Sequence, residues 1–172
     1  MQSSKLSRPI ITTKGGDKGY SRVYGGRRLR KDDLLFEALG SLDELSSLLG
    51  VLIAKNTDNE LKEILTLIQK DLYKIMAFIA GKKSQKLRLE EMINFFEQEI
   101  KRVSKEGGVT NRFILPQGTE LVAFLHFARA VARRAERRLV AVCGNEEILK
   151  YLNRLSDFLF AKAVEREEGV WV

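Results

Sequence analysis

The chain of 172 residues is 44% hydrophobic and 31% charged, which is enough apolar material for one ordinary core and predicts a single domain. Two prolines, many charges and no apolar run near the ~18 residues that a bilayer needs argue against collagen-like, disordered and membrane-spanning proteins. The single cysteine, Cys143, excludes an internal disulfide, and the single histidine, His126, excludes a His-rich zinc site.

Residues 1–31 are predicted to form a basic, glycine-rich arm. They contain nine lysines and arginines and one acid, Asp17, whereas residues 32–172 are close to neutral. Five of the 13 glycines precede residue 27, and residues 12–31 show neither a helical nor a strand period. We therefore expect an extended loop with a short strand around Arg22–Tyr24. This charge distribution indicates an anionic partner, of which phosphate is the commonest.

Residues 32–172 are predicted to form the helical part of the same domain. Apolar residues recur at steps of three and four in five stretches, at about residues 32–56, 58–80, 87–104 and 119–142 and from 145 onward. Asp58 or Asn59 in the second stretch and Asn145 in the fifth are suited to cap their helices. Five such helices with short connections predict an all-α fold, a five-helix antiparallel bundle of ferritin-like type with an extended N-terminal arm.

Residues 109–118, V-T-N-R-F-I-L-P-Q-G, interrupt the helical pattern with a mostly apolar stretch. The Pro-Gln-Gly ending favours a loop, and Phe113 is its one aromatic residue. An apolar loop between helices must pack on the bundle or contact a ligand, so we expect this loop to lie against the helices.

The arm contains the text T-T-K-G-G-D-K-G-Y-S, which is suited to binding an anion. Closely spaced glycines let backbone N–H groups converge on one anion. Lys14, Lys18 and Lys31 can neutralise its charge, and the hydroxyls of Thr13 and Ser21 can donate hydrogen bonds. The spacing matches neither a Walker A loop nor a dinucleotide-binding fingerprint. A basic tail that binds nothing in particular stays open as the alternative.

The fourth helical stretch places five arginines within ten residues, from 129 to 138. Helical geometry puts Arg129, Arg133 and Glu136 in a stripe beside the apolar seam, and Arg134 and Arg138 on the outer side. An arginine that borders a core must be paired or bind an anion, because an isolated buried charge costs several kcal/mol or more. A solvated charged face is the open alternative, above all for the outer arginines.

Three further polar residues lie beside apolar seams. Asp43, in G-S-L-D-E-L, can pair with one of the seam-bordering arginines, either within the subunit or across an interface. Asn153 and Asp157 are four residues apart and face the same way on the fifth helix. Structural pairing explains each of them equally well.

Five separated motifs together carry a resemblance to a known family. They are T-K-G-G-D-K-G-Y-S, G-S-L-D-E-L, F-I-L-P, L-H-F-A-R-A-V-A-R-R-A-E-R-R and Y-L-N-R-L-S-D-F-L-F. In this order and spacing the chain resembles the PduO-type ATP:cob(I)alamin adenosyltransferases from Thr12 to Phe160. The resemblance implies a cobalamin adenosyltransferase-like bundle that assembles as a homotrimer, with ATP and the corrinoid at subunit interfaces. It also implies the reaction: the 5′-deoxyadenosyl group of ATP passes to the cobalt of cob(I)alamin, giving adenosylcobalamin and triphosphate.

The resemblance also implies roles for individual residues. The residues that match ATP contacts are Thr13, Lys14, Gly15, Gly16, Ser21, Arg22, Lys31, Arg133, Arg134, Glu136, Arg137 and Asn153. Phe113 matches an aromatic side chain pressed against the lower face of the corrin ring, and Asp43 and Arg129 match an inter-subunit ion pair beside it. With Arg133, these three are the implied catalytic residues. Two departures from the family pattern are Arg22, where Thr or Ser is common, and P-Q-G-T after F-I-L-P.

The resemblance implies partners as well as substrates. Mg²⁺ is expected on the ATP phosphates, with no metal held by protein side chains alone, and a cob(II)alamin reductase and a B12-dependent acceptor enzyme are expected partners. Residues 1–12 lack the apolar stretch of a secretory signal, so we expect a cytoplasmic protein that binds neither membrane nor nucleic acid. Two rival readings are a non-catalytic nucleotide or corrinoid carrier and a helical nucleic-acid binder, which leaves Phe113, Asp43 and Asn153 without a role.

Overall fold

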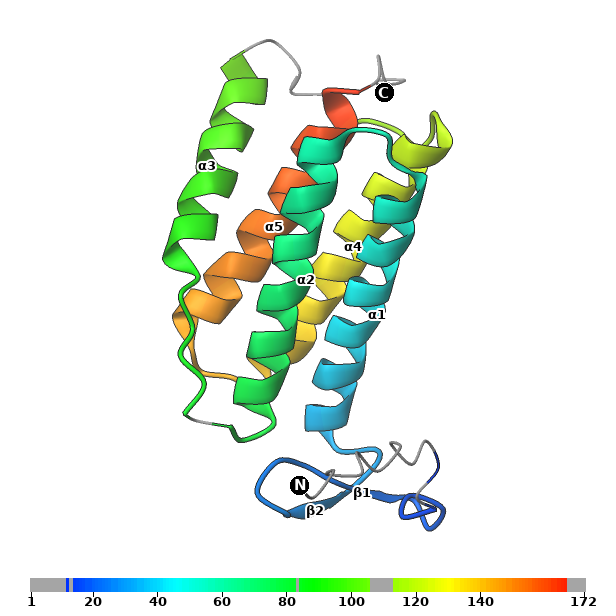
Figure 1. Ribbon diagram of the computed structural model, residues 1–172, viewed down its shortest axis with the longest axis vertical. Coiled ribbons are helices and arrows are strands. Elements are labelled where there is room, and N and C mark those ends of the chain that lie inside the picture. The colour runs from blue at the N-terminus through cyan, green and yellow to red at the C-terminus, as the bar shows by residue number, and fades with distance from the viewer. Residues whose placement is uncertain (1–11, 13, 83, 106–112, 167–172) are drawn as a thin grey trace, which may run out of the picture.

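A computed structural model describes residues 12, 14–82, 84–105 and 113–166 of the protein, and these form five helices and one small hairpin (Figure 1). The elements are β1 (Tyr20–Arg22), β2 (Arg28–Arg30), α1 (Leu34–Lys55), α2 (Asn59–Ile79), α3 (Glu90–Lys105), α4 (Glu120–Val140) and α5 (Glu146–Val164). The predicted all-α, five-helix bundle is confirmed.

Side-chain caps fix where four of the helices begin. The residues before α1, α2, α4 and α5 each accept a hydrogen bond from a backbone N–H in the first turn, and they are Asp33, Asp58, Thr119 and Asn145. A cap of this kind contributes about 1 kcal/mol. The third helix begins at Glu90, three residues later than predicted, and the N–H of Leu89, just before it, donates to Glu147 Oε1 of α5 at 3.2 Å.

The helices pack as a bundle in which α1 contacts α2 and α4, α4 contacts α5, and α5 contacts α3. Figure 1 shows α1, α3 and α5 running in one direction and α2 and α4 in the other. The neighbours α3 and α5 are therefore parallel, whereas the other contacting pairs are antiparallel. Within the described ranges, no helix has the length and apolarity needed to cross a bilayer.

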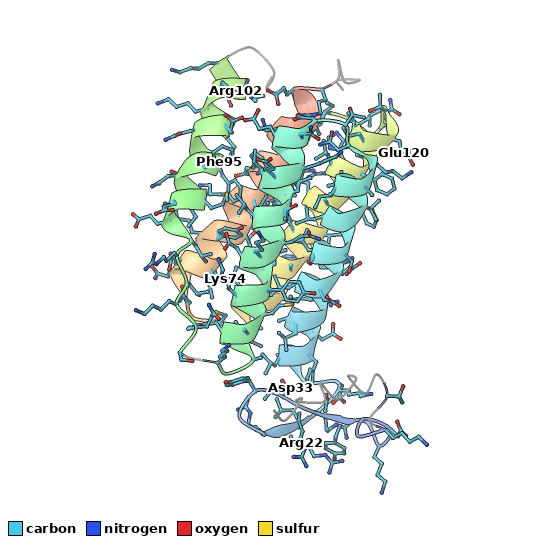
Figure 2. All side chains as sticks on the ribbon, in the orientation of Figure 1. Arg22, Asp33, Lys74, Phe95, Arg102 and Glu120 are labelled. Carbon is cyan, nitrogen blue, oxygen red and sulfur yellow. The ribbon has the colours of Figure 1, made fainter. Side chains whose placement is uncertain are left out.

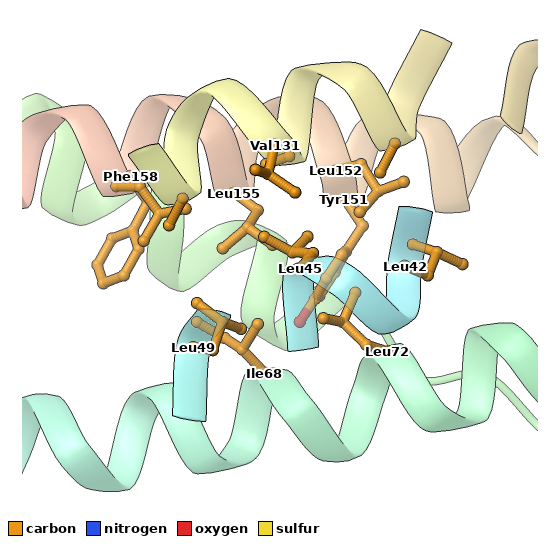
Figure 3. Packing of buried hydrophobic residues seen from close by; sticks show 14 of the residues in the cluster. Leu42, Leu45, Leu49, Ile68, Leu72, Val131, Tyr151, Leu152, Leu155 and Phe158 are labelled. Carbon is orange, nitrogen blue, oxygen red and sulfur yellow. The ribbon is translucent and has the colours of Figure 1, made fainter. Parts of the chain in front are cut away.

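Leucines, isoleucines and aromatic residues from all five helices fill a common core (Figure 3). The hydroxyl of Tyr151 reaches into it: Tyr151 is fully buried, and its hydroxyl donates to Asp71 Oδ2 of α2 at 3.4 Å. Lys74 Nζ lies 2.7 Å from the other oxygen of that carboxylate. Burial, reinforced by Asp71, raises the pKa of Tyr151, so the phenol stays protonated and donates.

The arm contains a β-hairpin, which corrects the expectation of an extended loop with one strand at Arg22–Tyr24. Strands β1 and β2 pair antiparallel, with Ser21 opposite Leu29. The first strand ends at Arg22 because Gly25 and Gly26, at φ 86° and 85°, turn the chain, and Val23 N–H donates to Arg27 C=O at 3.0 Å. The connection after α2 meets the hairpin at Gly81, where a Cβ atom would lie 3.0 Å from the Tyr24 carbonyl oxygen.

The opposite end of the bundle is held by a network of charges, near Arg102 in Figure 2. Glu99 of α3 accepts from Arg102 at 3.0 Å and from Lys162 of α5 at 2.7 Å. The side chain of Lys162 is only 9% exposed, and Glu165 pairs with it at 3.1 Å. This cluster ties the C-terminal end of α3 to that of α5.

Acid is expected to weaken this cluster. The hydrogen bond from Arg102, together with Lys162, lowers the pKa of Glu99 from 4.5 to about 2. A lowered carboxyl pKa stabilises the fold above pH 4.5, and this contribution, at most about 3 kcal/mol, is lost as the pH falls from 4.5 towards 2. Chemical denaturation of the wild type and of Glu99→Gln across that range should show a flatter pH dependence in the variant. Glu63→Gln, at an exposed site on α2, is the control, and parallel curves for Glu99→Gln and the wild type would contradict the expectation.

Candidate active site

A cavity of about 290 Å³ lies where the loop before α4 meets α4 and α5. Its lining comes from three separate segments of sequence and consists of Phe113, Ile114, Arg129, Arg133, Ser156, Asp157 and Phe160. We call it the Phe113 cavity. It combines aromatic surface with two guanidinium groups and one carboxylate, so it is suited to a ligand that is both flat and polar.

Phe113 is the most unusual apolar residue of this cavity, because 84% of it is exposed. The next residue, Ile114, is partly buried and anchors the loop against the helices. Leaving a phenylalanine ring in water forfeits about 1.5–3 kcal/mol relative to burying it. An exposed ring at the edge of a cavity is therefore a ready platform for an apolar or planar ligand.

Arg129 points a partly buried guanidinium into the Phe113 cavity. Its Cζ lies 6.0 Å from the centre of the Phe160 ring, and its Nε has no hydrogen-bond acceptor among the described residues. Burial lowers the pKa of Arg129, and the neighbouring charge of Arg133 lowers it further. A buried donor without an acceptor is costly, so this group is suited to receive a carboxylate or another oxygen from outside the chain.

A polar cluster continues from Arg133 along α4 and across to α5. Arg137 Nη1 donates to the carbonyl of Arg133 at 3.1 Å, and Asn153 Nδ2 of α5 donates to Glu136 Oε1 at 3.1 Å. Arg133 is exposed and makes no ion pair within the described part of the chain. The structure thus brings together four of the residues that the resemblance links to ATP: Arg133, Glu136, Arg137 and Asn153.

The other two arginines of this run face α1 instead. Arg134 forms an ion pair with Glu44, and Arg138 lies 2.6 Å from Glu37 and donates to Ser41 Oγ at 3.0 Å. Further along the same two helices, Lys55 of α1 pairs with Glu120 of α4 at 2.7 Å. We call these three pairs the α1–α4 charge ladder. Arg134, which the resemblance links to ATP, is thus paired with Glu44 within the chain.

On the arm, the structure brings some of the predicted ATP contacts close together and places others on opposite faces. Lys31 lies over Gly16, since a Cβ there would be 2.9 Å from Lys31 Nζ. Adjacent strand residues point to opposite faces, so half-buried Ser21 and exposed Arg22 cannot present their side chains to the same side of the hairpin. Lys14 is exposed at φ 55°, Gly15 and Gly16 follow it in a turn, and Thr13 lies outside the described residues.

Asp43 lies away from the Phe113 cavity. It is exposed on α1, in a groove of about 540 Å³ that is otherwise lined by Ser46, Ser47, Thr66, Gln69, Lys70 and Tyr73. The two cavities share no lining residue. The pairing of Asp43 with an arginine of the same subunit, which the sequence left open, is therefore not made among the described residues.

Four cavity residues were absent from the predicted site: Ile114, which follows Phe113 in the loop, and three residues of α5, Ser156, Asp157 and Phe160. The signal of the α5 residues in the sequence was the spacing of Asn153 and Asp157 at i and i+4, which continues to Phe160 on the same side of α5. Phe160 also contacts the buried His126, with ring centres 6.1 Å apart. No group of three or more His, Cys, Asp or Glu suited to hold a metal ion occurs in the described ranges.

Comparisons with known proteins match nearly the whole length of the chain. A profile of the family described as cobalamin adenosyltransferase matches residues 11–165. The chain is 41% identical over 165 residues to the corrinoid adenosyltransferase of Bacillus subtilis, which covers 89% of this chain and 84% of that protein. It is 39% identical over 176 residues to human corrinoid adenosyltransferase MMAB, with 94% of this chain and 70% of the human protein covered.

Solved structures agree with the sequence comparisons. A variant PduO-type ATP:corrinoid adenosyltransferase from Lactobacillus reuteri, complexed with cobalamin and ATP, superposes with a TM-score of 0.86 at 32% identity. The superposition covers 95% of this chain and 96% of that one. The match extends over the arm, the loop of Phe113 and the helices that line its cavity, and the resemblance predicted from five motifs is confirmed: the chain belongs to the cobalamin adenosyltransferase family.

Proposed function

We propose that this protein transfers the 5′-deoxyadenosyl group of ATP to the cobalt of cob(I)alamin, forming adenosylcobalamin and releasing triphosphate. The observation that carries the proposal is the Phe113 cavity, in which an exposed ring lies beside two arginines. Relatives named corrinoid adenosyltransferases, and a neighbour complexed with cobalamin and ATP, support it.

The protein does not need to supply a nucleophilic side chain, because cob(I)alamin is itself the nucleophile. The protein holds the ribose 5′-carbon in line with cobalt and stabilises the charge that builds on the leaving triphosphate. Lys14, Lys31, Arg133 and Arg137 are suited to that charge. Phe113 covers the lower face of the corrin ring and keeps a lower axial ligand and its water away, which makes the reduced cobalt easier to form.

Mg²⁺ carried on ATP fits the residues that surround the proposed phosphate position. It takes phosphate oxygens and waters and needs only one or two protein carboxylates. Glu136 is the one carboxylate among the proposed ATP contacts, and it lies beside Arg133 and Arg137 on α4. Glu136 would therefore hold the ion, which neutralises phosphate charge when bound.

We propose that the site is shared between subunits of a homotrimer. In Figure 1 the hairpin lies at one end of the bundle and the start of α4, which the Phe113 loop precedes, at the other; α4 has 21 residues and is about 32 Å long, so the arm of a subunit lies far from its own Phe113. We propose that the arm of one subunit, residues 1–31, meets the α4–α5 cluster of the next. The unfilled Arg129 Nε and the exposed Asp43, which has no ion pair among the described residues, are then suited to pair across that interface.

A spectroscopic assay tests the function directly. Protein, ATP, Mg²⁺ and chemically reduced cobalamin are mixed without oxygen, and the absorbance spectrum is followed for adenosylcobalamin while triphosphate is measured. A carrier would bind ATP or cobalamin with no spectral conversion, and a nucleic-acid binder would show salt-sensitive retention of DNA or RNA. Either result without product formation would contradict the proposal.

The reaction requires one enzyme to supply the reduced cobalamin and another to use the adenosylcobalamin. A reductase must deliver an electron to cob(II)alamin, and a B12-dependent enzyme must accept the product. Both ATP and such a reductant are available in the cytoplasm, which is where we propose that the protein acts.

Asp43→Asn is expected to weaken corrinoid use and assembly while leaving the folded subunit intact. An interfacial charge that loses its partner typically costs ~2–5 kcal/mol, whereas Asp43 has no ion pair to lose within the described chain. Sedimentation, thermal unfolding and the KM for cobalamin test this. Glu44→Gln is the comparison variant, because it removes the carboxylate next to Asp43 in the sequence and breaks an ion pair within the subunit, that with Arg134. A trimeric, fully active Asp43→Asn protein would refute the pairing.

A further inference from the structure

Asn153 is held by hydrogen bonds at both ends of its amide. Its Nδ2 donates to Glu136 Oε1 of α4 at 3.1 Å, and its Oδ1 accepts from Arg154 Nη1 at 2.7 Å. A side-chain amide can turn over and exchange its donor and acceptor, but a guanidinium can only donate. Arg154 therefore requires the amide oxygen on its own side, and this directs the Asn153 N–H₂ group towards Glu136.

Arg154 is itself anchored on α3. Its Nε donates to Glu97 Oε1 at 2.9 Å, and Lys150 Nζ lies 3.4 Å from the same oxygen. The hydrogen bond from Arg154, with the help of Lys150, lowers the pKa of Glu97, so the carboxylate stays charged as an acceptor. The contacts form one continuous chain from Glu97 on α3, through Arg154 and Asn153 on α5, to Glu136 on α4.

We propose that Arg154 is a positioning residue for the nucleotide site: anchored by Glu97, it fixes the Asn153 amide and thereby the Glu136 carboxylate beside Arg133 and Arg137. The inference rests on the proposed function and adds to it a role for α3, none of whose residues lines the Phe113 cavity. Arg154 does not line that cavity either, so it acts through Asn153.

The chain offers a matched control for the loss of an ion pair. Lys150 also lies on α5 and also pairs with Glu97, but it makes no hydrogen bond to Asn153. If the chain of contacts serves only to pack α3 on α5, then Arg154→Met and Lys150→Met should behave alike. If Arg154 positions the amide, only Arg154→Met should weaken ATP binding.

The experiment is a double-mutant cycle on the full-length protein. The dissociation constant for Mg·ATP is measured by titration calorimetry, and kcat and the KM for ATP are measured in the spectroscopic assay. Arg154→Met is expected to raise Kd and KM for ATP about tenfold, as expected for one charge-assisted hydrogen bond, while Lys150→Met changes them less than twofold. In an Asn153→Ala background, Arg154→Met should have almost no further effect.

Other outcomes overturn the inference. Additive effects of Asn153→Ala and Arg154→Met, or equal effects of Arg154→Met and Lys150→Met, would show that Arg154 acts only through stability. Circular dichroism and thermal unfolding check the fold of each variant. Should Arg154→Met not fold, Arg154→Lys, which keeps the charge but cannot bridge Glu97 and Asn153, takes its place in the cycle. The proposed function fails separately, if the wild type binds ATP but forms no adenosylcobalamin, and absence of ATP binding by the wild type would overturn both.

Discussion

Replacing Phe113 with alanine is expected to lower kcat/KM for cob(I)alamin about 10- to 100-fold and to leave ATP affinity within about twofold. The ring is 84% exposed in the chain alone, so its burial under the corrinoid contributes about 1.5–3 kcal/mol, which corresponds to that range of rates. Alanine leaves the lower face of the ring open to water, and the reduced cobalt is then harder to form. The nucleotide contacts lie on other segments and are unchanged.

The measurement pairs single-turnover spectroscopy with ATP titration. Leu115→Ala is the control, because Leu115 is in the same loop and 40% exposed but does not line the Phe113 cavity. It should retain nearly full turnover. If Phe113→Ala kept the wild-type rate together with wild-type ATP affinity, the assignment of the ring to the corrinoid would be wrong.

Arg133→Lys is expected to lower kcat/KM for ATP about 100-fold, which is the typical effect of removing one preorganised donor from a developing anion. Lysine keeps the charge, but an ammonium group cannot present two parallel N–H donors to a phosphate as the guanidinium does. Arg133 lines the Phe113 cavity and makes no ion pair in the described part of the chain, so its donors are available to a ligand.

Arg138→Lys provides the comparison on the same helix. Arg138 is engaged by Glu37 and Ser41 of α1, so the exchange should change kcat/KM by less than about threefold. Steady-state kinetics with ATP varied at saturating cob(I)alamin separates the two variants. Similar losses in both would indicate that the arginines act through the general charge of α4 and not through a defined contact.

The sequence predicted the helices well because their burial pattern is periodic over many turns. Leu42, Leu45 and Leu49 recur at steps of three and four, and all three are completely buried. The hairpin was missed because its strands have three residues each, too few for a period of two to stand out. What defines it is the turn at Gly25 and Gly26, whose positive φ angles a sequence does not display.

The candidate site was predictable only in part, since it joins segments that periodicity cannot relate. The stripe on α4 placed Arg129 and Arg133 correctly beside the seam, and the structure puts both in one cavity with Phe113. The partner of Arg134 was not predictable, because the side of α4 that meets α1 depends on how the helices are ordered around the core. For the same reason the separation of Asp43 from Arg129 became visible only in three dimensions.

The α1–α4 charge ladder favours one of the two directions in which α4 can run in the bundle. Leucine-rich helices of similar length pack almost equally well when one of them is turned end for end, so apolar contacts alone do not choose between the two topologies. Along α1 the charged residues of the ladder are Glu37, Glu44 and Lys55. Their partners on α4 are Arg138, Arg134 and Glu120, which come in the matching order only when the two helices are antiparallel. A reversed α4 would place Glu120 opposite Glu37 and Arg138 opposite Lys55, with like charges meeting at both ends.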